Sequence, residues 1–226
     1  MGSVYGAHLL LQATVDKSPT ISWLRSVCVY CRESSFLVTV KKDKAQLREE
    51  VRAERLMAFR EGACEASKKL SHHLLVLLES QPVCKIAGYW AVGSEINLSP
   101  LLGDLDEKGW NVSLPVVLKK DAPLIFRRWR LGDKLIVGPF NTLQPKPRCD
   151  EVIPNVVLVP LLAFDNQRFR LGQGGGFYDR TLEKLKNNDC GVLSIGVAFA
   201  AQEVNAVPCE EYDERLDFIV TEDGRV

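Results

Sequence analysis

Two apolar segments separated by a helical pattern constrain the fold of this chain more than any other feature. Residues 156–160 and 192–199 are rich in Val, Leu and Ile, as strands buried on both faces of a sheet are. Residues 179–186, which lie between them, have the pattern of a helix. Strands that alternate with helices in this way build parallel sheets. We therefore expect a central, mainly parallel sheet.

The remainder of the chain extends this alternation. The helical pattern from Asp43 to Glu79 predicts two helices, the second running from about Glu61 to Glu79 and ending before Pro82. Gly109 is a natural terminator for a helix at 98–108. Further strands are predicted at 85–90, 111–117, 124–130 and 218–220. The expected fold class is α/β, a three-layer sandwich with a mainly parallel central sheet and helices on both faces.

Residues 1–40 lack the periodicity of the rest of the chain. They are poor in acidic residues and contain Ser, as transit peptides do, but they have few Arg and little amphipathic order. The other interpretation, which we favour, is a start site assigned too far upstream. The expected organisation is an N-terminal extension at 1–40, disordered or mis-assigned, and one globular domain at 41–226.

The composition excludes several classes of partner. Lys plus Arg equals Asp plus Glu at 29 each, so the bulk charge points to neither nucleic acid nor a membrane. No apolar run reaches the ~18 residues of a membrane span, and the N-terminus does not resemble a signal peptide. Seven irregularly spaced cysteines indicate a reduced, cytoplasmic protein. Cys28 and Cys31 lack the second pair that a zinc site needs.

The segment from Arg170 to Arg180 carries the strongest chemical signal. Its sequence, Arg-Leu-Gly-Gln-Gly-Gly-Gly-Phe-Tyr-Asp-Arg, holds four glycines in five residues just before a predicted helix. Such a loop can present several backbone N–H groups to one phosphate. Arg170 adds a positive charge, and Asp179 is suited to a Mg²⁺ ion that bridges phosphate oxygens.

Other interpretations of this loop stay open on the residues alone. It is neither a Walker A loop nor a dinucleotide-binding fingerprint, because the required spacing is absent, and a flexible surface turn would also be rich in glycine. An α/β protein could hold a phosphorylated ligand without turning it over. A CoA transferase could use Glu95 as its nucleophile, and a sugar-phosphate isomerase could share the sheet.

The glycine segment, together with Val-Pro-Leu-Leu-Ala-Phe-Asp at 159–165, resembles the signature of the 5-formyltetrahydrofolate cyclo-ligase family. Three further segments are similar to family motifs in the same order: Lys-Ala-Gln-Leu-Arg at 44–48, Ser-Glu-Ile at 94–96, and Val-Pro at 207–208 followed by Asp213 and Asp217. The resemblance covers about residues 41–226. A relative that serves another pathway, such as thiamine metabolism, would share these motifs.

The resemblance implies a reaction and its cofactors, ATP and Mg²⁺. ATP phosphorylates the formyl oxygen of 5-formyltetrahydrofolate, N10 attacks the activated carbon, and phosphate leaves as 5,10-methenyltetrahydrofolate forms. Phosphoryl transfer depends on positioning and charge stabilisation, so the lack of an obvious nucleophile is no objection. The implied partner is a reduced folate, including polyglutamylated forms that Lys119 and Lys120 could meet, and the expected assembly is a monomer or weak dimer.

The resemblance also implies the site residues. The implied ATP-binding residues are Lys44, Arg48, Arg170, Leu171, Gly172, Gln173, Gly174, Gly175, Gly176, Phe177 and Tyr178. The implied catalytic residues are Arg170 and Tyr178, and the implied metal ligands are Asp179 and Asp213. The substrate would be bound by Trp90, Glu95, Phe140 and Tyr178. A carboxylate such as Glu95 can accept two adjacent N–H donors of the pterin, and aromatic rings can form its walls.

Taken without the family, several of these residues have structural interpretations. Lys44 and Arg48 share a helix face that solvent alone could cover. Asp179 also fits a helix N-terminus, Glu95 a surface acid, and at least one of Tyr89 and Trp90 the core. Some family members carry a basic residue in place of Gln173 or Gly175, so this loop brings less side-chain charge to the phosphates.

Overall fold

The computed structural model describes residues 43–79, 81–82, 84–187, 191–210 and 212–226. The predicted extension at 1–40, the Cys28–Cys31 motif and Cys190 lie outside them. A seven-stranded sheet has the order β11-β10-β9-β6-β1-β2-β3. Its strands are β1 (Lys85–Ala87), β2 (Asn111–Val116), β3 (Ile125–Arg128), β6 (Val156–Pro160), β9 (Leu193–Val197), β10 (Phe218–Thr221) and β11 (Gly224–Arg225).

The five inner strands of this sheet are parallel, and the two edge strands are antiparallel to their neighbours. The chain runs from β1 to its neighbour β2 in one direction and from β6 to its neighbour β9 in the other. The direction of winding therefore reverses between β1 and β6. In open α/β sheets, ligands bind beyond the carboxyl ends of the strands at such a reversal.

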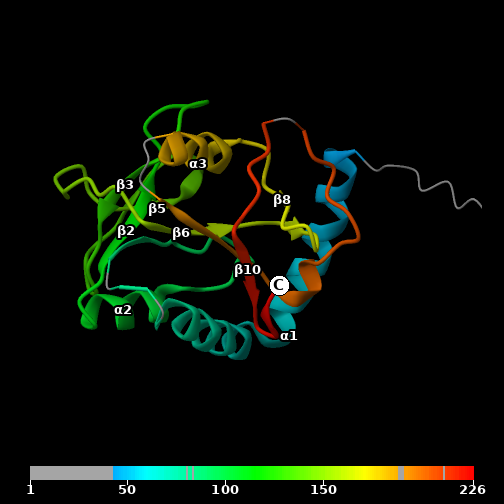
Figure 1. Cartoon of the computed structure of the whole chain (residues 1–226), viewed down its shortest axis with the longest axis horizontal. Coiled ribbons are helices and arrows are strands. Elements are labelled where there is room, and N and C mark those ends of the chain that lie inside the picture. The colour runs from blue at the N-terminus through cyan, green and yellow to red at the C-terminus, as the bar shows by residue number, and fades with distance from the viewer. Residues whose placement is uncertain (1–42, 80, 83, 188–190, 211) are drawn as a thin grey trace, which may run out of the picture. The chain divides into compact units, whose positions relative to one another are not determined.

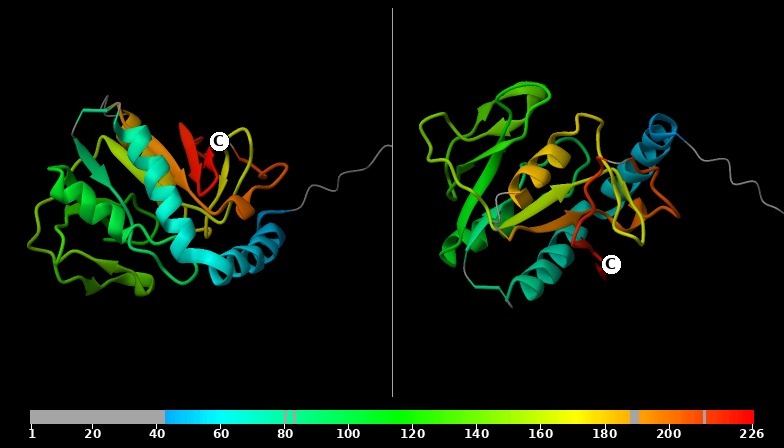
Figure 2. Two further views of the ribbon diagram at one scale, coloured as in Figure 1. Left: turned by 90° about the horizontal axis from the view of Figure 1, so that it is seen from below. Right: turned by 45° about the horizontal axis from the view of Figure 1, so that its top comes forward.

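In the described part of the chain, three α-helices cover the sheet: α1 (Lys44–Glu79), α2 (Ser99–Glu107) and α3 (Phe177–Asn187). Asp43 caps α1 by accepting a hydrogen bond from the Gln46 backbone N–H, 2.7 Å from N to Oδ1. The helical geometry of α1 is interrupted at Gly62, close to the predicted division at Glu61, and Figure 2 shows the resulting bend. Gly109 ends α2 with a φ of +88°, as predicted.

The helices lie on both faces of the sheet, as Figure 1 shows for α3 on one side and α2 with the later part of α1 on the other. Leu70, Leu74 and Leu101 pack with Ile86 and Leu158 into one apolar cluster. A separate cluster joins α3 to the opposite face through the buried side chains Leu182, Leu185, Val157, Val159 and Ile219. The predicted three-layer sandwich is therefore confirmed.

The start of α1 has a different neighbour. Leu47 and Val51 pack against Leu162, Ala163 and Leu171 in a third apolar cluster, so this half of the helix lies beside β8 (Figure 1). The contact places the beginning of α1 next to the glycine loop, which follows β8 directly in the chain.

Among the described residues, five short strands, including β11, and two 3-10 turns were not predicted. β4 (Ile136–Val137) pairs with β5 (Leu143–Gln144) around the turn η1 (Pro139–Asn141), β7 (Ala163–Phe164) pairs with β8 (Arg170–Leu171), and η2 (Ala200–Gln202) follows β9. Two-residue strands are too short to show a hydrophobic period. The strands expected at 85–90 and 124–130 are shorter than predicted, because the polypeptide leaves the sheet after Ala87 and after Arg128 and continues as a loop.

A buried carboxylate fixes the hairpin that leads into the glycine loop. Asp165 is 3% exposed, and its side chain accepts hydrogen bonds from the backbone N–H groups of Gln167, Phe169 and Val207. β7 and β8 are thereby tied to the C-terminal segment, and Arg170 leaves the hairpin in a defined direction. None of the described helices is long and apolar enough to cross a membrane, and the four described cysteines are free thiols.

Candidate active site

A cleft of about 1090 Å³ opens beyond the carboxyl ends of the central strands, where the winding of the sheet reverses. Residues that follow β1, β2 and β6 line it, together with the start of α1, the glycine loop and the first turns of α3. Every site residue implied by the sequence lies in this lining: Lys44, Arg48, Trp90, Glu95, Phe140, the whole of 170–179 and Asp213. The fold thus brings together motifs that are up to 169 residues apart.

The glycine loop is shaped by backbone conformations that favour glycine. Gly174 and Gly176 have φ values of +103° and +61°, a region that L side chains rarely adopt. The Arg48 guanidinium donates to the Gly172 carbonyl, with Nε and O 2.9 Å apart, and lies close to Gly174. The first N–H groups of α3 follow the loop without helical partners. The arrangement combines backbone donors with an arginine, as phosphate sites do.

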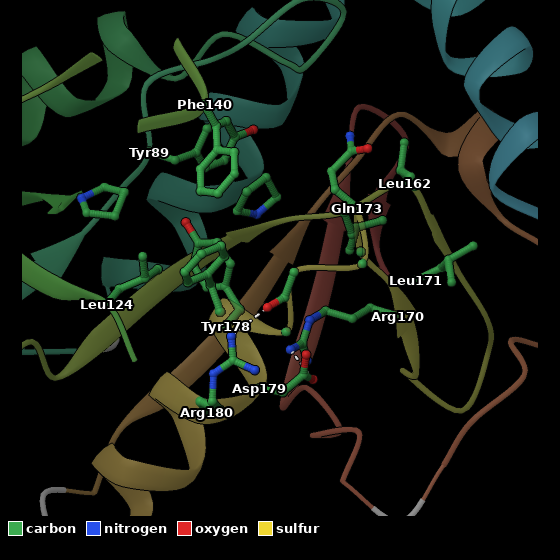
Figure 3. Close-up of a pocket in the computed structure, with 18 of the residues that line it drawn as sticks. Tyr89, Leu124, Phe140, Leu162, Arg170, Leu171, Gln173, Tyr178, Asp179 and Arg180 are labelled. Carbon is green, nitrogen blue, oxygen red and sulfur yellow. Dashed lines mark hydrogen bonds and ion pairs between the residues drawn. The ribbon is translucent and has the colours of Figure 1, made fainter. Parts of the chain in front are cut away.

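Arg170 and Asp179 form an ion pair at the base of the loop, with Nη2 and Oδ1 2.6 Å apart (Figure 3). The Arg170 side chain is only 4% exposed, and it also donates to the Glu214 backbone carbonyl. Burial lowers the pKa of Arg170, while Asp179, Asp213 and Glu214 oppose that shift. Arg170 is thus a cation fixed by the Asp179 carboxylate and the Glu214 backbone carbonyl.

Lys44 closes the same end of the cleft. Its Nζ lies 2.6 Å from Oδ2 of Asp213 and 3.1 Å from Oε2 of Glu210. Burial alone would lower the pKa of Lys44, but the hydrogen bonds to these two carboxylates outweigh it and raise the pKa. Asp213 therefore belongs to the site, whereas Asp217 accepts hydrogen bonds from the backbone N–H and the hydroxyl of Ser194 and has a structural role.

A further carboxylate, that of Glu95, lies in the cleft away from Lys44 and Arg170. Glu95 accepts a hydrogen bond from the Val92 backbone N–H at 2.9 Å, and its Oε1 lies 3.8 Å from Nη1 of Arg55. Burial raises the pKa of Glu95, and the Val92 N–H and the charge of Arg55 partly offset that rise. Burial and the charge of Glu95 together raise the pKa values of Tyr89 and Tyr178, so both phenols stay protonated beside it.

Aromatic rings form walls between these two ends. Phe140, at a φ of +58° in η1, is 66% exposed and meets the ring of Phe177 edge-on at 5.8 Å. Trp90 lies edge-on to Trp129 at 6.0 Å between ring centroids. In Figure 3, Tyr89 and Phe140 lie on one side of the cavity and Arg170 with Asp179 on another. Tyr89 is 3% exposed and donates its O–H to the Ile96 carbonyl, so it is the core member of the Tyr89–Trp90 pair.

The carboxylates of Asp179 and Asp213 are suited to a metal ion whose remaining coordination positions are filled by a bound ligand. The described residues contain no group of three or more His, Cys, Asp or Glu side chains that could hold a metal. Asp179 and Asp213 both lie close enough to Arg170 to raise its pKa against the effect of burial, and Asp179 accepts a hydrogen bond from the backbone N–H of Glu214, the residue after Asp213. Mg²⁺ commonly uses one or two carboxylates together with substrate phosphates, and these two residues fit that pattern.

Two arginines of the cleft were given no role by the sequence. Arg180 donates to the Gly175 carbonyl and lies over the Phe177 ring, 5.5 Å from its centroid, so it supplies positive charge where the loop has none. Arg55 is 7% exposed. The sequence contained a signal for Arg55, since it follows Leu47 and Val51 at the spacing of the buried helix face. Lys119 and Lys120 are both exposed, and Lys120 lines the cleft.

Comparisons with known proteins agree on one family. A family model described as the 5-formyltetrahydrofolate cyclo-ligase family matches residues 40–222. The 5-formyltetrahydrofolate cyclo-ligase of Haemophilus influenzae is 32% identical over 178 residues, which is 76% of this chain and 94% of that protein. The Escherichia coli protein of the same name is 33% identical over 141 residues, 60% of this chain and 76% of that protein.

Solved structures show the same architecture. The 5,10-methenyltetrahydrofolate synthetase of Aquifex aeolicus superposes with a TM-score of 0.65 at 29% identity, over 80% of this chain and 91% of that one. The synthetase of Mycoplasma pneumoniae shares the fold with a TM-score of 0.64 at 22% identity, over 80% of this chain and 99% of that one.

Proposed function

This chain belongs to the 5-formyltetrahydrofolate cyclo-ligase family, and from that premise we propose that it converts 5-formyltetrahydrofolate to 5,10-methenyltetrahydrofolate with ATP, releasing ADP and phosphate. One observation carries the proposal. A phosphate-type loop with its cations and a partly buried carboxylate flanked by aromatic rings line the same cleft. A transfer from ATP to a folate needs both halves within reach of each other. The catalytic domain is residues 41–226, close to the span of the family match.

The cationic end is the ATP half of the proposed site. Lys44 and Arg48 from α1 and Arg170 from β8 line the cleft together with the glycine loop, and the loop adds backbone N–H groups. Fixed donors of this kind stabilise the charge that spreads over a transferring phosphoryl group. Arg170 is the residue best placed to act in the transition state, because its guanidinium is held by Asp179 and the Glu214 carbonyl.

Asp179 and Asp213 are the proposed Mg²⁺ ligands. When bound, the ion would neutralise part of the charge on the phosphates of ATP. Each carboxylate is engaged by a cation of the site, Asp179 by Arg170 and Asp213 by Lys44. When MgATP binds, Arg170 and Lys44 would interact with its phosphates as well as with the two carboxylates.

The opposite end is the folate half. Glu95 is the acceptor for the adjacent N–H donors of the pterin, and Trp90, Phe140 and Tyr178 are the surfaces for its rings. Because the phenols of Tyr89 and Tyr178 stay protonated, the Glu95 carboxylate is the negatively charged acceptor among these three side chains. The folate would then extend from Glu95 towards the glycine loop, with its N5-formyl group between the two halves.

The atoms balance in two steps. The formyl oxygen takes the γ-phosphoryl group, so an O–P bond forms as the bond to ADP breaks. N10 then attacks the formyl carbon and loses its proton, and the C–O bond breaks to release phosphate. The residues of the site orient both ligands and stabilise charge, and no covalent bond to the protein is needed. Tyr178, next to the loop and near Glu95, is proposed to contact the reacting region.

Three finer points belong to the same proposal. The substrate includes polyglutamylated folates, for which Lys120 offers a cation at the rim of the cleft. The chain acts as a monomer or weak dimer, and its location is cytoplasmic, as the cysteine pattern of the sequence indicates.

The test mixes purified protein with 5-formyltetrahydrofolate and MgATP and follows the near-ultraviolet absorbance of the methenyl product. An increase that requires both ATP and Mg²⁺ and is matched by ADP formation is expected. Loss of the increase without ATP is the control. ATP binding with no product would instead favour a different substrate, or a protein that holds a phosphorylated ligand without turnover.

A further inference from the structure

Arg55 is a charged residue on the buried side of α1. It is 7% exposed, although Leu47 and Val51 on the same helix face are apolar and pack in the core. Burying a guanidinium without full hydrogen bonding is unfavourable, so its position at the wall of the cleft requires an explanation.

The contacts of Arg55 orient its guanidinium towards the Glu95 carboxylate. Its Nε donates to the Ser94 hydroxyl at 3.0 Å, which fixes the plane of the guanidinium. Nη1 then lies 3.8 Å from Oε1 of Glu95, close enough for charge attraction but too far for a hydrogen bond. Nη1 has no hydrogen-bond acceptor among the described residues. A buried donor without an acceptor, beside the proposed pterin carboxylate, points to a ligand atom that accepts.

The edge of a pterin offers such an atom. Its 2-amino and N3–H groups are donors, and its 4-oxo group is an acceptor next to them. A carboxylate satisfies the donors but leaves the oxo group without a partner. A guanidinium beside the carboxylate supplies the missing donor, and its fixed fork geometry suits recognition in one plane.

We propose that Arg55 is the second pterin-recognition residue: it orients the Glu95 carboxylate and donates its free Nη1–H to the 4-oxo group of the substrate. This inference rests on the proposed folate substrate. The charged and titratable groups that face Glu95 are Arg55 from α1, Tyr89 from the loop after β1, and Tyr178 from α3. Of these, Arg55 alone carries a charge at neutral pH, so it is the group that favours the ionised carboxylate.

The test compares wild-type protein with Arg55→Gln on two substrates, 5-formyltetrahydrofolate and its analogue with a 4-amino group in place of the 4-oxo group. Because a hydrogen bond from a charged donor is lost, KM for the natural substrate is expected to rise about 10- to 100-fold. KM for ATP should stay within about twofold. The wild-type preference for the 4-oxo substrate should decrease in Arg55→Gln, because the contact between Arg55 and the 4-oxo group is lost. The part of the preference that comes from the N3–H donor to Glu95, which the 4-amino analogue also lacks, should remain.

A pH profile separates positioning from general damage. Without the charge of Arg55, the pKa of Glu95 rises further, so the loss of folate binding at low pH should begin at a higher pH in Arg55→Gln. Arg60→Gln, an exposed arginine of the same helix, is the matched control and should change neither KM nor the profile. Ser94→Ala, which removes the acceptor that orients Arg55, should weaken folate binding in the same selective way even if Arg55→Gln does not fold.

Several results would overturn the proposal. Equal increases in KM for both folates, or for folate and ATP alike, would show a structural role only. An unchanged KM in Arg55→Gln would show that Arg55 does not meet the substrate. If the wild-type protein gave no turnover, the proposed function would fail by itself, and calorimetric binding of the two folates to wild-type and Arg55→Gln protein would still decide the role of Arg55.

Discussion

Replacing Asp179 separates its structural contact from its proposed role in Mg²⁺ binding. Asp179→Ala leaves the Arg170 side chain, 4% exposed, without its carboxylate. Breaking a buried ion pair in this way costs about 3–5 kcal/mol. Because the Asp179 side chain is 28% exposed, water replaces part of the contact, and about 2–3 kcal/mol is expected. That corresponds to a fall in Tm of about 5–10 °C for a chain of this size.

Asp179→Asn, compared with Asp179→Ala, keeps the hydrogen bonds but removes the negative charge. Its amide oxygen can still accept from Nη2 of Arg170 and from the Glu214 backbone N–H, the two donors that Asp179 engages. The free energy of unfolding should therefore fall by only about 1 kcal/mol. Both variants lack the carboxylate, so the Mg²⁺ concentration for half-maximal rate should rise at least about tenfold in each.

The assays are thermal unfolding and Mg²⁺ titration of the initial rate. Asp104→Asn, an exposed acid of α2, is the control and should match the wild type in both. A wild-type Tm in Asp179→Ala would refute the energetic role of the ion pair. A wild-type Mg²⁺ requirement in Asp179→Asn would refute metal binding by Asp179.

Three further predictions concern the site, and a fourth concerns the hairpin that leads into the glycine loop. Glu95→Gln should raise KM for the folate about 10- to 100-fold with KM for ATP unchanged. In the wild type, KM for the folate should rise as falling pH protonates Glu95, and at a higher pH than for an ordinary glutamate because its pKa is raised; a flat folate KM across pH would contradict this role. Arg180→Gln should raise KM for ATP about tenfold. Adding Gln173→Arg to that variant should bring KM for ATP back towards the wild-type value, and no recovery would mean that Arg180 acts through Phe177 instead. Asp165→Ala should lower the free energy of unfolding by about 2–4 kcal/mol in chemical denaturation, because three backbone N–H groups lose their acceptor; a change under 1 kcal/mol would show that water replaces it.

Much of the fold was predictable because its long elements carry regular patterns. β6 and α2 were placed within about one residue of their bounds, and the bend in α1 was expected next to Gly62. The short hairpins were not predictable, since two residues show no period. One of them, β4–β5, carries Phe140 to the ring of Phe177, so the shape of the aromatic wall was outside the reach of local patterns.

The sequence by itself determined the glycine loop, the family motifs and the α/β class, because each depends on residues that are close in the chain. Only the tertiary structure decided which distant residues meet. Lys44 reaches Asp213 across 169 positions, and the reversal of winding between β1 and β6 places Glu95 and the loop in one cleft. It also decided that Arg55 faces Glu95. A helical period shows that a side chain lies on the inner face, but what it meets there depends on the packing of segments that the local sequence does not encode.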